Sequence, residues 1–599
     1  MIYHCEDHTC NYWDEGEKLP ERCPQCGRKL LRANETDMTG DDWTALGNTL
    51  WDAEASDKKR MVDCFRKAAY LGSAWGVCNL GICMEQGNGV EADPVQAFWL
   101  YQQAVEMGSL NAVCCLGVCY QYGIGTAPDA EKAAELYCKA AEYGSPRGQM
   151  LLARAFHDGI GVEADAAEAV HWVRAAAYQR YGEGMYRLGV CYEYGDGVEQ
   201  NWEHAVHWFR EAAESGVSTA MTDLGYCYEK GCGVEQSWEQ AFSWYRRGAE
   251  CGDLRSMHNL GYCYEKGCGV EQSWEQAFSW YRRGAECGYP VSMSNLGLCY
   301  KRGYGVEQNW QEAIKWYEQG AQCGDLQCMH NLACCYERGE GVEQNEERAL
   351  YWYRRGAEAG SDYCMYCLGW NYSNGEGVEQ NMTEAIRWYT AAAEGGNADA
   401  MHNLGWLYDH GEGVEQDMKK AICWYERAAE QNHPAAMNSL GECYAMGRGV
   451  PRDLETAMEW YRRAAELGEA MADYNMGWHL EQAGKLSEAY AHYRKAADGN
   501  DDSAWWALGR FYENGVVVAQ DGKEARRCYE TGEKLGSVKC KMRLARCKLL
   551  GIGGRREKKA GLDLCRQALE LAKESSEKED YGYEAEMNLL RRTIAENES

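Results

Sequence analysis

The chain of 599 residues contains 62 Lys and Arg against 93 Asp and Glu, which gives a net charge of −31. Such a surface repels nucleic-acid phosphates and anionic membranes, although it allows a local basic patch, and it favours neutral or basic partners. No apolar run reaches the roughly 18 residues of a membrane-spanning helix, and the amino terminus has no basic stretch followed by an apolar core. We therefore expect a cytoplasmic protein without a secretory signal.

Residues 1–32 carry two pairs of cysteines that together suit one metal ion. The second pair, Cys23 and Cys26, is followed by glycine, and a Cys-x-x-Cys-Gly turn brings two thiolates to one tetrahedral ion. The first pair, Cys5 and Cys10, is more widely spaced, and His8 is an alternative to Cys10. The segment resembles a zinc ribbon or a rubredoxin-like knuckle. We predict one structural Zn²⁺ on the four cysteines, with a redox iron centre or a nucleic-acid finger as the alternatives.

After a polar stretch over residues 33–42, which we interpret as a linker or a cap, the chain is built from repeats over residues 43–572. Their period is 36 residues, because the sequence from Gly225 to Gly252 recurs letter for letter from Gly261 to Gly288. A fixed period of this length indicates stacked helical units rather than one globular core. A Leu-Gly step marks each of 15 repeats in chain order. Its glycine, or the alanine that replaces it, is at Gly47, Gly81, Gly117, Ala153, Gly189, Gly225, Gly261, Gly297, Ala333, Gly369, Gly405, Gly441, Gly477, Gly509 and Ala545.

Each repeat is predicted to form two helices joined by a glycine turn. In the eleventh repeat, Ala400 and Leu404 belong to an apolar stripe with the spacing of one helix face. Gly411 and Gly413 allow positive φ and end this first helix. The second helix is expected over residues 417–429, since an aspartate suited to a cap position precedes its small and aromatic residues.

The repeated pattern is Ala-x-x-x-Leu-Gly-x-x-Tyr-x-x-Gly-x-Gly-Val, followed by Ala-x-x-Trp-Tyr-x-x-Ala-Ala-Glu-x-Gly. It resembles the Sel-1-like repeat family, whose members are relatives of the tetratricopeptide repeats. The resemblance implies an all-α fold, a right-handed α-α superhelical solenoid of about 15 helix pairs with a concave groove, and an adaptor function. One departure lies between Gly477 and Gly509, where the turn is shorter and closer to a tetratricopeptide turn. Residues 573–599 are predicted to cap the array, with an amphipathic helix over 583–596.

Three residue types recur at fixed positions that we assign to the core. Cysteines two residues after the Leu-Gly step are interpreted as small buried apolar residues in a reducing compartment rather than as a disulfide framework. Methionines four residues before the step are expected to fill the core, with an adaptable binding ridge as the alternative. Tryptophans that begin second helices are interpreted as structural. The cysteines are Cys83, Cys119, Cys191, Cys227, Cys263, Cys299, Cys335, Cys443 and Cys547; the methionines are Met185, Met221, Met257, Met293, Met329, Met365, Met401 and Met437; the tryptophans are Trp202, Trp238, Trp274 and Trp310.

Three positions of the first helix are candidates for a binding surface. Positions −3, +1 and +4 relative to the Leu-Gly glycine lie opposite the buried stripe at 100° per residue. Aromatic rings at +1 and acids at +4 suit a groove for a peptide with basic groups, since rings give contact area at low entropic cost and carboxylates select charge. The alternative is that these side chains make ordinary contacts between repeats. The predicted partner-binding residues are Tyr226, Glu229, His258, Tyr262, Glu265, Trp370, His402, Trp406 and Asp409.

The sequence contains no Gly-x-Ser-x-Gly elbow, no His-Glu-x-x-His helix, no phosphate loop and no dinucleotide fingerprint. We therefore predict a non-catalytic scaffold that binds protein or peptide partners rather than a small-molecule substrate. One alternative is a nucleic-acid-associated factor that uses the ribbon. Another is β-lactam or cell-wall ligand binding, as in a cysteine-rich branch of the family, although this chain lacks that branch's signal peptide and regular cysteine pairing.

Overall fold

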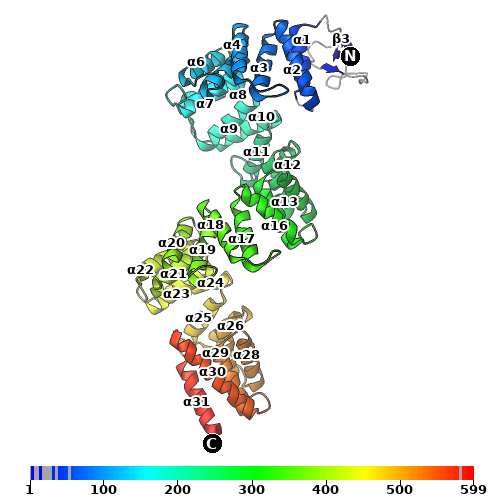
Figure 1. The fold of residues 1–599 in the computed structure, drawn as a ribbon. Helices are drawn as coiled ribbons and strands as arrows, with labels where there is room; N and C mark the ends of the chain where they lie inside the picture. The colour runs from blue at the N-terminus through cyan, green and yellow to red at the C-terminus, as the bar shows by residue number, and fades with distance from the viewer. Residues whose placement is uncertain are drawn as a thin grey trace. The chain divides into compact units, whose positions relative to one another are not determined.

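The chain divides into two compact parts, an amino-terminal part over residues 1–309 and a carboxy-terminal part over residues 310–599 (Figure 1). The computed structural model describes residues 2–5, 13–15, 30–33, 38–51, 55–578 and 583–598. Helices dominate both parts, as the repeat pattern predicts. None of the described helices is both long and apolar enough to cross a bilayer.

A small antiparallel sheet lies at the start of the amino-terminal part, in the segment predicted as a ribbon. Its strand order is β2-β1-β3, and Tyr3 of the central strand pairs with Asp14 on one side and Arg32 on the other. The strands are β1 (Ile2–Cys5), β2 (Trp13–Glu15) and β3 (Leu30–Ala33).

First and second helices then alternate along the chain at the predicted positions, and most are 13 residues long. In the amino-terminal part the helices are α1 (Gly40–Thr49), α2 (Ala55–Tyr70), α3 (Ala74–Gln86), α4 (Pro94–Glu106), α5 (Leu110–Tyr122), α6 (Ala130–Glu142), α7 (Pro146–Asp158), α8 (Ala166–Tyr178), α9 (Gly182–Tyr194), α10 (Trp202–Glu214), α11 (Ser218–Lys230), α12 (Trp238–Glu250), α13 (Leu254–Lys266), α14 (Trp274–Glu286) and α15 (Pro290–Arg302). In the carboxy-terminal part they are α16 (Trp310–Gln322), α17 (Leu326–Arg338), α18 (Glu346–Glu358), α19 (Asp362–Asn374), α20 (Met382–Glu394), α21 (Ala398–His410), α22 (Met418–Glu430), α23 (Pro434–Met446), α24 (Leu454–Glu466), α25 (Ala470–Gln482), α26 (Leu486–Asp498), α27 (Asp502–Asn514), α28 (Gly522–Lys534), α29 (Val538–Leu550), α30 (Lys558–Lys578) and α31 (Glu584–Glu598).

Capping residues and glycines fix where the helices of a repeat begin and end. In the third repeat, the Ser109 hydroxyl accepts a hydrogen bond from the backbone N–H of Ala112 (3.3 Å) and starts α5. Helix α5 ends at Gly123, whose φ of 73° lies in the left-handed region that glycine adopts without strain. Asp129 then starts α6 by accepting a hydrogen bond from the backbone N–H of Lys132 (3.1 Å). This succession recurs in most repeats and explains the regular helix length.

A buried aromatic ring joins the two helices of most repeats. In the sixth repeat, Tyr245 of α12 is fully buried, and a Cβ placed on Gly225 of α11 would lie 2.6 Å from its ring. The Leu-Gly glycine therefore lets the tyrosine ring pack closely against the first helix. The fully buried tyrosines at this position are Tyr101, Tyr137, Tyr245, Tyr281, Tyr317, Tyr353, Tyr389, Tyr425, Tyr461, Tyr493 and Tyr529.

Alanine replaces the glycine in three repeats, and two of these repeats also lack the ring. The pairs without a ring are Ala153 with Val173 and Ala545 with Cys565. The ninth repeat keeps both an alanine and a ring, and Ala333 and Tyr353 are both fully buried there. An alanine methyl group and an aromatic ring can therefore occupy this position together.

Neighbouring repeats meet where the glycine turn of one repeat touches the second helix of the repeat before it. Gly269 has a φ of 70°, and a Cβ there would lie 2.2 Å from the carbonyl oxygen of Trp238, the first residue of α12. The second glycine of the turn thus allows a close approach of two backbones. Each of the four predicted tryptophans begins a second helix, which is consistent with a structural role.

Burial confirms the predicted core positions of the cysteines and methionines. Eight of the nine cysteines and seven of the eight methionines are buried, whereas Cys191 and Met365 are half-buried. Burial raises the pKa of Cys227 and Cys263 to about 12, so these thiols stay protonated at neutral pH. None of the cysteines from Cys64 to Cys565 forms a disulfide.

The carboxy-terminal end has the predicted final helix, α31, which packs on α29 and α30. Arg543 of α29 donates a hydrogen bond to Glu586 of α31 (2.7 Å), and both side chains are largely buried. The shorter turn predicted after Gly477 is also present, because only three residues separate α25 from α26. A buried ion pair thus holds the last helix on the last repeat.

Candidate functional site

The aromatic residues predicted at position +1 lie on first helices and reach the surface. Tyr226 on α11 is 44% exposed, Tyr262 on α13 is 39% exposed and Trp370 on α19 is 44% exposed. Trp406 on α21 is half-buried and stacks on His410, with 4.3 Å between ring centroids. We call these four residues, Tyr226, Tyr262, Trp370 and Trp406, the first-helix aromatics.

The acids predicted at position +4 already take part in the packing of their own repeats. Glu229 accepts a hydrogen bond from the buried hydroxyl of Tyr245 (2.8 Å), and its other oxygen lies 2.8 Å from the ammonium of Lys230. Glu265 repeats this arrangement with the hydroxyl of Tyr281 (2.9 Å). Both carboxylate side chains are less than one-fifth exposed. Each acid is therefore a structural acceptor as well as a candidate contact for a partner.

The other predicted residues lie deeper than the sequence suggests. Burial lowers the pKa of His258 and of His402 to about 4, which keeps both imidazoles neutral at physiological pH. His402 also stacks on His433, with 5.1 Å between ring centroids. Asp409 is 4% exposed and pairs with Arg448 at 2.9 Å. The imidazoles and the Asp409 carboxylate thus contact their own and neighbouring repeats, and the first-helix aromatics form the accessible portion of the predicted surface.

The predicted metal ligands are only partly within the described residues. Cys5 is the last residue of β1, whereas Cys10, Cys23, Cys26 and the alternative ligand His8 lie outside the described residues. Among the described residues, no three His, Cys, Asp or Glu side chains are grouped so as to hold a metal ion. The zinc site remains a prediction from the cysteine spacing.

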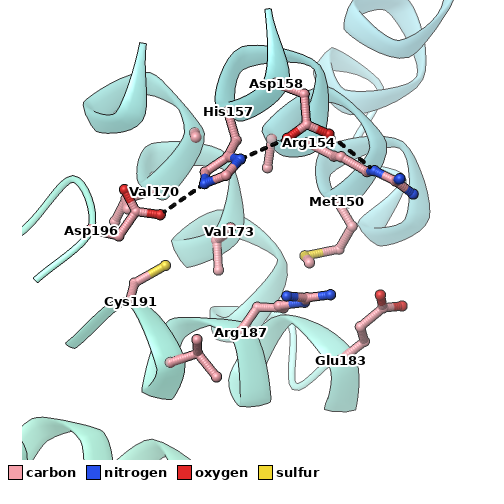
Figure 2. A pocket seen from close by; sticks show the side chains of 13 residues that line it. Met150, Arg154, His157, Asp158, Val170, Val173, Glu183, Arg187, Cys191 and Asp196 are labelled. Carbon is pink, nitrogen blue, oxygen red and sulfur yellow. Dashed lines mark hydrogen bonds and ion pairs between the residues drawn. The ribbon is translucent and has the colours of Figure 1, made fainter. Parts of the chain in front are cut away.

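A pocket that was not predicted lies in the fourth repeat, where the aromatic ring is absent. Helices α7, α8 and α9 enclose a cavity of about 440 Å³, bordered by Ala153 and Val173, the positions that hold glycine and tyrosine in most other repeats (Figure 2). Met150, Val170 and Val190 add to its apolar wall. We call this cavity the α7–α9 pocket.

Some of the first-helix residues that line this pocket occupy positions predicted for partner binding. Met150, Arg154 and His157 are at −3, +1 and +4 relative to Ala153. The sequence feature that accompanies the pocket is the loss of both the glycine and the aromatic ring in one repeat. The sequence alone does not predict a pocket from this loss, because a smaller side chain leaves a cavity only if the surrounding helices keep their spacing.

Charged groups surround the mouth of the pocket. His157 Nδ1 lies 2.7 Å from Asp158, and His157 Nε2 lies 3.1 Å from Asp196 in the turn of the next repeat (Figure 2). The carboxylate of Asp158 raises the pKa of His157, since both ring nitrogens face acids that favour the imidazolium. Arg154 Nε is 3.3 Å from Asp158. The two aspartates are therefore engaged by Arg154 and His157.

Arg187 differs from these groups because it has no ion-pair partner among the described residues. Its guanidinium lies below Met150, with the carboxylate of Glu183 to one side of it (Figure 2). Burial raises the pKa of the Cys191 thiol in the pocket to about 11, so it is not an activated nucleophile at neutral pH. A cavity with an apolar wall on one side and charged side chains on the other suits binding better than catalysis.

Comparison with known families supports the repeat assignment. A family model described as Sel1 repeat matches 14 segments of the chain, which correspond to the second through the fifteenth repeat. The matched residues are 76–109, 112–145, 146–181, 182–217, 218–253, 254–289, 290–325, 326–361, 362–397, 398–433, 434–469, 470–501, 504–537 and 538–573.

Two solved structures are similar to this chain. The chain is 32% identical to c5321, a protective antigen of uropathogenic Escherichia coli strains that displays an SLR fold; the match covers 75% of this chain and 97% of that chain, with a TM-score of 0.51. It is 30% identical to a Sel1 repeat protein from Oxalobacter formigenes over 41% of this chain and 96% of that chain, with a TM-score of 0.37. No curated protein matches the chain. Because the family model matches most of its length, the chain belongs to the Sel1 repeat family.

Proposed function

We propose that this protein is a non-catalytic scaffold of the cytoplasm that binds polypeptide partners along its first helices. The observation that carries the proposal is the exposure of Tyr226 and Tyr262 on α11 and α13, two first helices that contact each other. Large exposed rings at repeating positions are typical of interaction surfaces. In a right-handed superhelix of the kind that the family resemblance implies, these helices would line the concave groove.

The proposed partner segments carry basic groups. The net charge of −31 favours them, and Glu229 and Glu265 place carboxylates beside the two exposed rings. Lys230 and Lys266 now pair with these acids, but both lysines are about half exposed. Exposed ion pairs are worth only about 0–1 kcal/mol, so a basic group of a partner can replace the lysine at little cost.

Affinity capture from a lysate of the source organism tests the proposal. The bait is the full chain, compared with a variant in which all four first-helix aromatics are replaced by alanine. We expect specific proteins to be retained by the wild type and lost by this variant, because truncating buried interface rings typically costs more than 1 kcal/mol each.

A matched control removes exposed rings from second helices. Trp99→Ala on α4 and Tyr351→Ala on α18 remove side chains that are 64% and 52% exposed. The control variant should retain the captured proteins. Circular dichroism and thermal unfolding must show that both variants stay helical, since Trp406 stacks on His410. Equal capture by the wild type and the four-alanine variant would overturn the proposal.

We also propose that Cys5, Cys10, Cys23 and Cys26 bind one structural Zn²⁺, with the Cys-x-x-Cys-Gly spacing as the support. Elemental analysis of the purified full chain should find zinc at about one ion per chain. Cys23→Ser should lower this content, whereas Cys251→Ser, which changes an exposed cysteine of the array, should not. Iron in place of zinc would favour the redox alternative, and no metal would refute the site.

A further inference from the structure

We propose that the α7–α9 pocket binds an aromatic side chain of a partner polypeptide, with an acidic residue of the same segment next to that ring. The inference rests on the proposed scaffold function and adds a second kind of contact to it. The exposed rings of α11 and α13 favour basic groups, whereas this pocket favours a ring beside a carboxylate.

The repeat itself defines the shape of the occupant. In most other repeats a buried tyrosine ring lies where α8 carries only Val173, and the cavity borders this valine. The ninth repeat demonstrates that a ring fits beside an alanine, since Ala333 and Tyr353 are both fully buried. The methyl group of Ala153 therefore does not by itself exclude a six-membered ring. The space left by Val173 is one that this fold fills with an aromatic ring elsewhere.

The walls of the pocket also suit an aromatic ring. Val170 and Val173 are buried, and Met150 lies at the opposite side of the cavity with its sulfur directed inward (Figure 2). A flexible thioether adapts its shape to a ring and makes favourable sulfur–aromatic contacts. Full burial of a phenyl side chain strengthens binding roughly tenfold to a hundredfold, which allows specific recognition at weak affinity.

The pocket and one of the exposed rings involve consecutive first helices. The pocket is lined in part by α7 and α9, which are the first helices of two consecutive repeats. Helix α9 contacts α11, the first helix of the next repeat, through a hydrogen bond from the Tyr186 hydroxyl to Asp223 (2.9 Å). Tyr226 is on α11 as well. An extended segment that follows consecutive first helices of the amino-terminal part would therefore pass both the pocket and Tyr226.

The charged residues that line the pocket favour an acidic residue in the partner next to the inserted ring. Asp158 and Asp196 already contact His157, and Asp158 also pairs with Arg154. Arg187 is an exposed residue of the lining and has no ion-pair partner among the described residues, and Glu183 accepts a hydrogen bond from Tyr181 (3.5 Å). Of the cations that line the pocket, Arg187 is thus the one available for pairing. A carboxylate next to the inserted ring complements it, and arginine is well suited to this because its planar donors match a carboxylate.

The test uses saturation-transfer NMR on the full chain with three acetylated and amidated tripeptides, Glu-Phe-Glu, Lys-Phe-Lys and Glu-Ala-Glu. We expect the ring protons of Glu-Phe-Glu to receive saturation, and its affinity to exceed that of the other two peptides. Val173→Phe places a ring in the cavity, as Phe209 does in the next repeat, and should weaken Glu-Phe-Glu roughly tenfold or more. Val95→Phe, at a side chain that is 55% exposed on α4, is the matched control and should leave binding unchanged.

Arg187→Gln gives a second readout at an exposed side chain, so its result does not depend on repacking of the core. It should weaken Glu-Phe-Glu several-fold and remove the preference over Lys-Phe-Lys. Equal binding of Glu-Phe-Glu to the wild type and Val173→Phe would overturn the pocket, and a preference for Lys-Phe-Lys would overturn its charge selection. A third ligand, phenylacetate, tests for a small-molecule site. If phenylacetate binds to the wild type and not to Val173→Phe, and none of the peptides binds, the pocket is a small-molecule site and the proposal of a polypeptide occupant is overturned.

The same variant separates failure of this inference from failure of the scaffold function. If Val173→Phe captures the same lysate proteins as the wild type while the variant of the first-helix aromatics loses them, the scaffold function holds and the pocket is not part of the interface. If neither variant changes capture, both proposals fail.

Discussion

Gly125 is a position where one added methyl group should separate two neighbouring repeats. Its φ is 68°, and a Cβ there would lie 2.1 Å from the carbonyl oxygen of Pro94, the first residue of α4 in the preceding repeat. Gly108 is a matched control, because its φ is 91° but no atom lies within 4 Å of its added Cβ. Gly108→Ala therefore adds backbone strain alone, whereas Gly125→Ala adds strain and a collision with backbone.

The geometry allows the two effects to be separated in magnitude. An alanine in the left-handed region costs about 1–2 kcal/mol, and the lower entropy of the unfolded chain offsets about 0.4–1 kcal/mol of this. Gly108→Ala should thus lower the free energy of unfolding by about 1 kcal/mol. At Gly125 the colliding atom is backbone and cannot rotate away, and forced shifts of this kind add about 1–3 kcal/mol. Gly125→Ala should therefore cost about 2–4 kcal/mol.

Hydrogen exchange measured by mass spectrometry on the full chain suits this comparison, because repeat arrays open locally and are not two-state. Peptides that cover α4 and α5 should exchange about fivefold to a hundredfold faster in Gly125→Ala than in Gly108→Ala. Peptides from distant repeats should not change. Equal exchange in the two variants, or a larger effect of Gly108→Ala, would refute the close approach of the turn to α4.

Three further substitutions test the core, the pocket and a buried imidazole. Tyr101→Phe removes the hydroxyl that donates to Glu85 (2.6 Å) and should lower the free energy of local opening of α3 and α4 by about 1 kcal/mol in hydrogen exchange, while an unchanged value would show that the bond adds nothing. Val173→Phe should raise the thermal midpoint by filling the α7–α9 pocket, and a lower midpoint would show that the cavity does not admit a ring. Burial lowers the pKa of His258 to about 4, so below pH 6.5 the unfolded chain binds a proton that the folded chain excludes. The free energy of local opening of α13 and α14 should then fall by roughly 2 kcal/mol between pH 7 and pH 5 on account of this group. His258→Leu should remove that part of the pH dependence, and an unchanged difference between the two pH values in hydrogen exchange, corrected for the intrinsic exchange rate, would contradict the assignment.

The helical repeat could be predicted in detail because each repeat encodes its own boundaries. A capping residue, a left-handed glycine and a second capping residue recur with the period of the chain, as in Ser109, Gly123 and Asp129. These are local signals that depend on backbone conformation and hydrogen bonding within a few residues. They identify where helices begin and end, but they do not show which side chains the neighbouring helix covers.

The roles of the site residues depend on contacts that local patterns do not contain. Glu229 was predicted as an acid of the partner-binding surface, but the Tyr245 hydroxyl of the next helix donates a hydrogen bond to it. The pocket in turn requires Asp196 of the next repeat beside His157, and a valine where a ring is usual. The residue type at one helix position cannot distinguish an exposed carboxylate from one that accepts a hydrogen bond from a buried hydroxyl. The partners of Glu229 and His157 lie in the second helix of the same repeat or in the next repeat.

Site-specific photo-crosslinking in cells of the source organism tests the central claim most directly. A benzophenone amino acid is placed at Tyr262 on α13 and, as a control, at Trp99 on α4, two exposed aromatic positions on a first and a second helix. Our account predicts that Tyr262 crosslinks to a discrete partner polypeptide, that Tyr226 gives the same partner, and that Trp99 does not. Crosslinks of equal strength from Trp99, or none from either tyrosine position, would contradict the proposal that the first helices carry the binding surface.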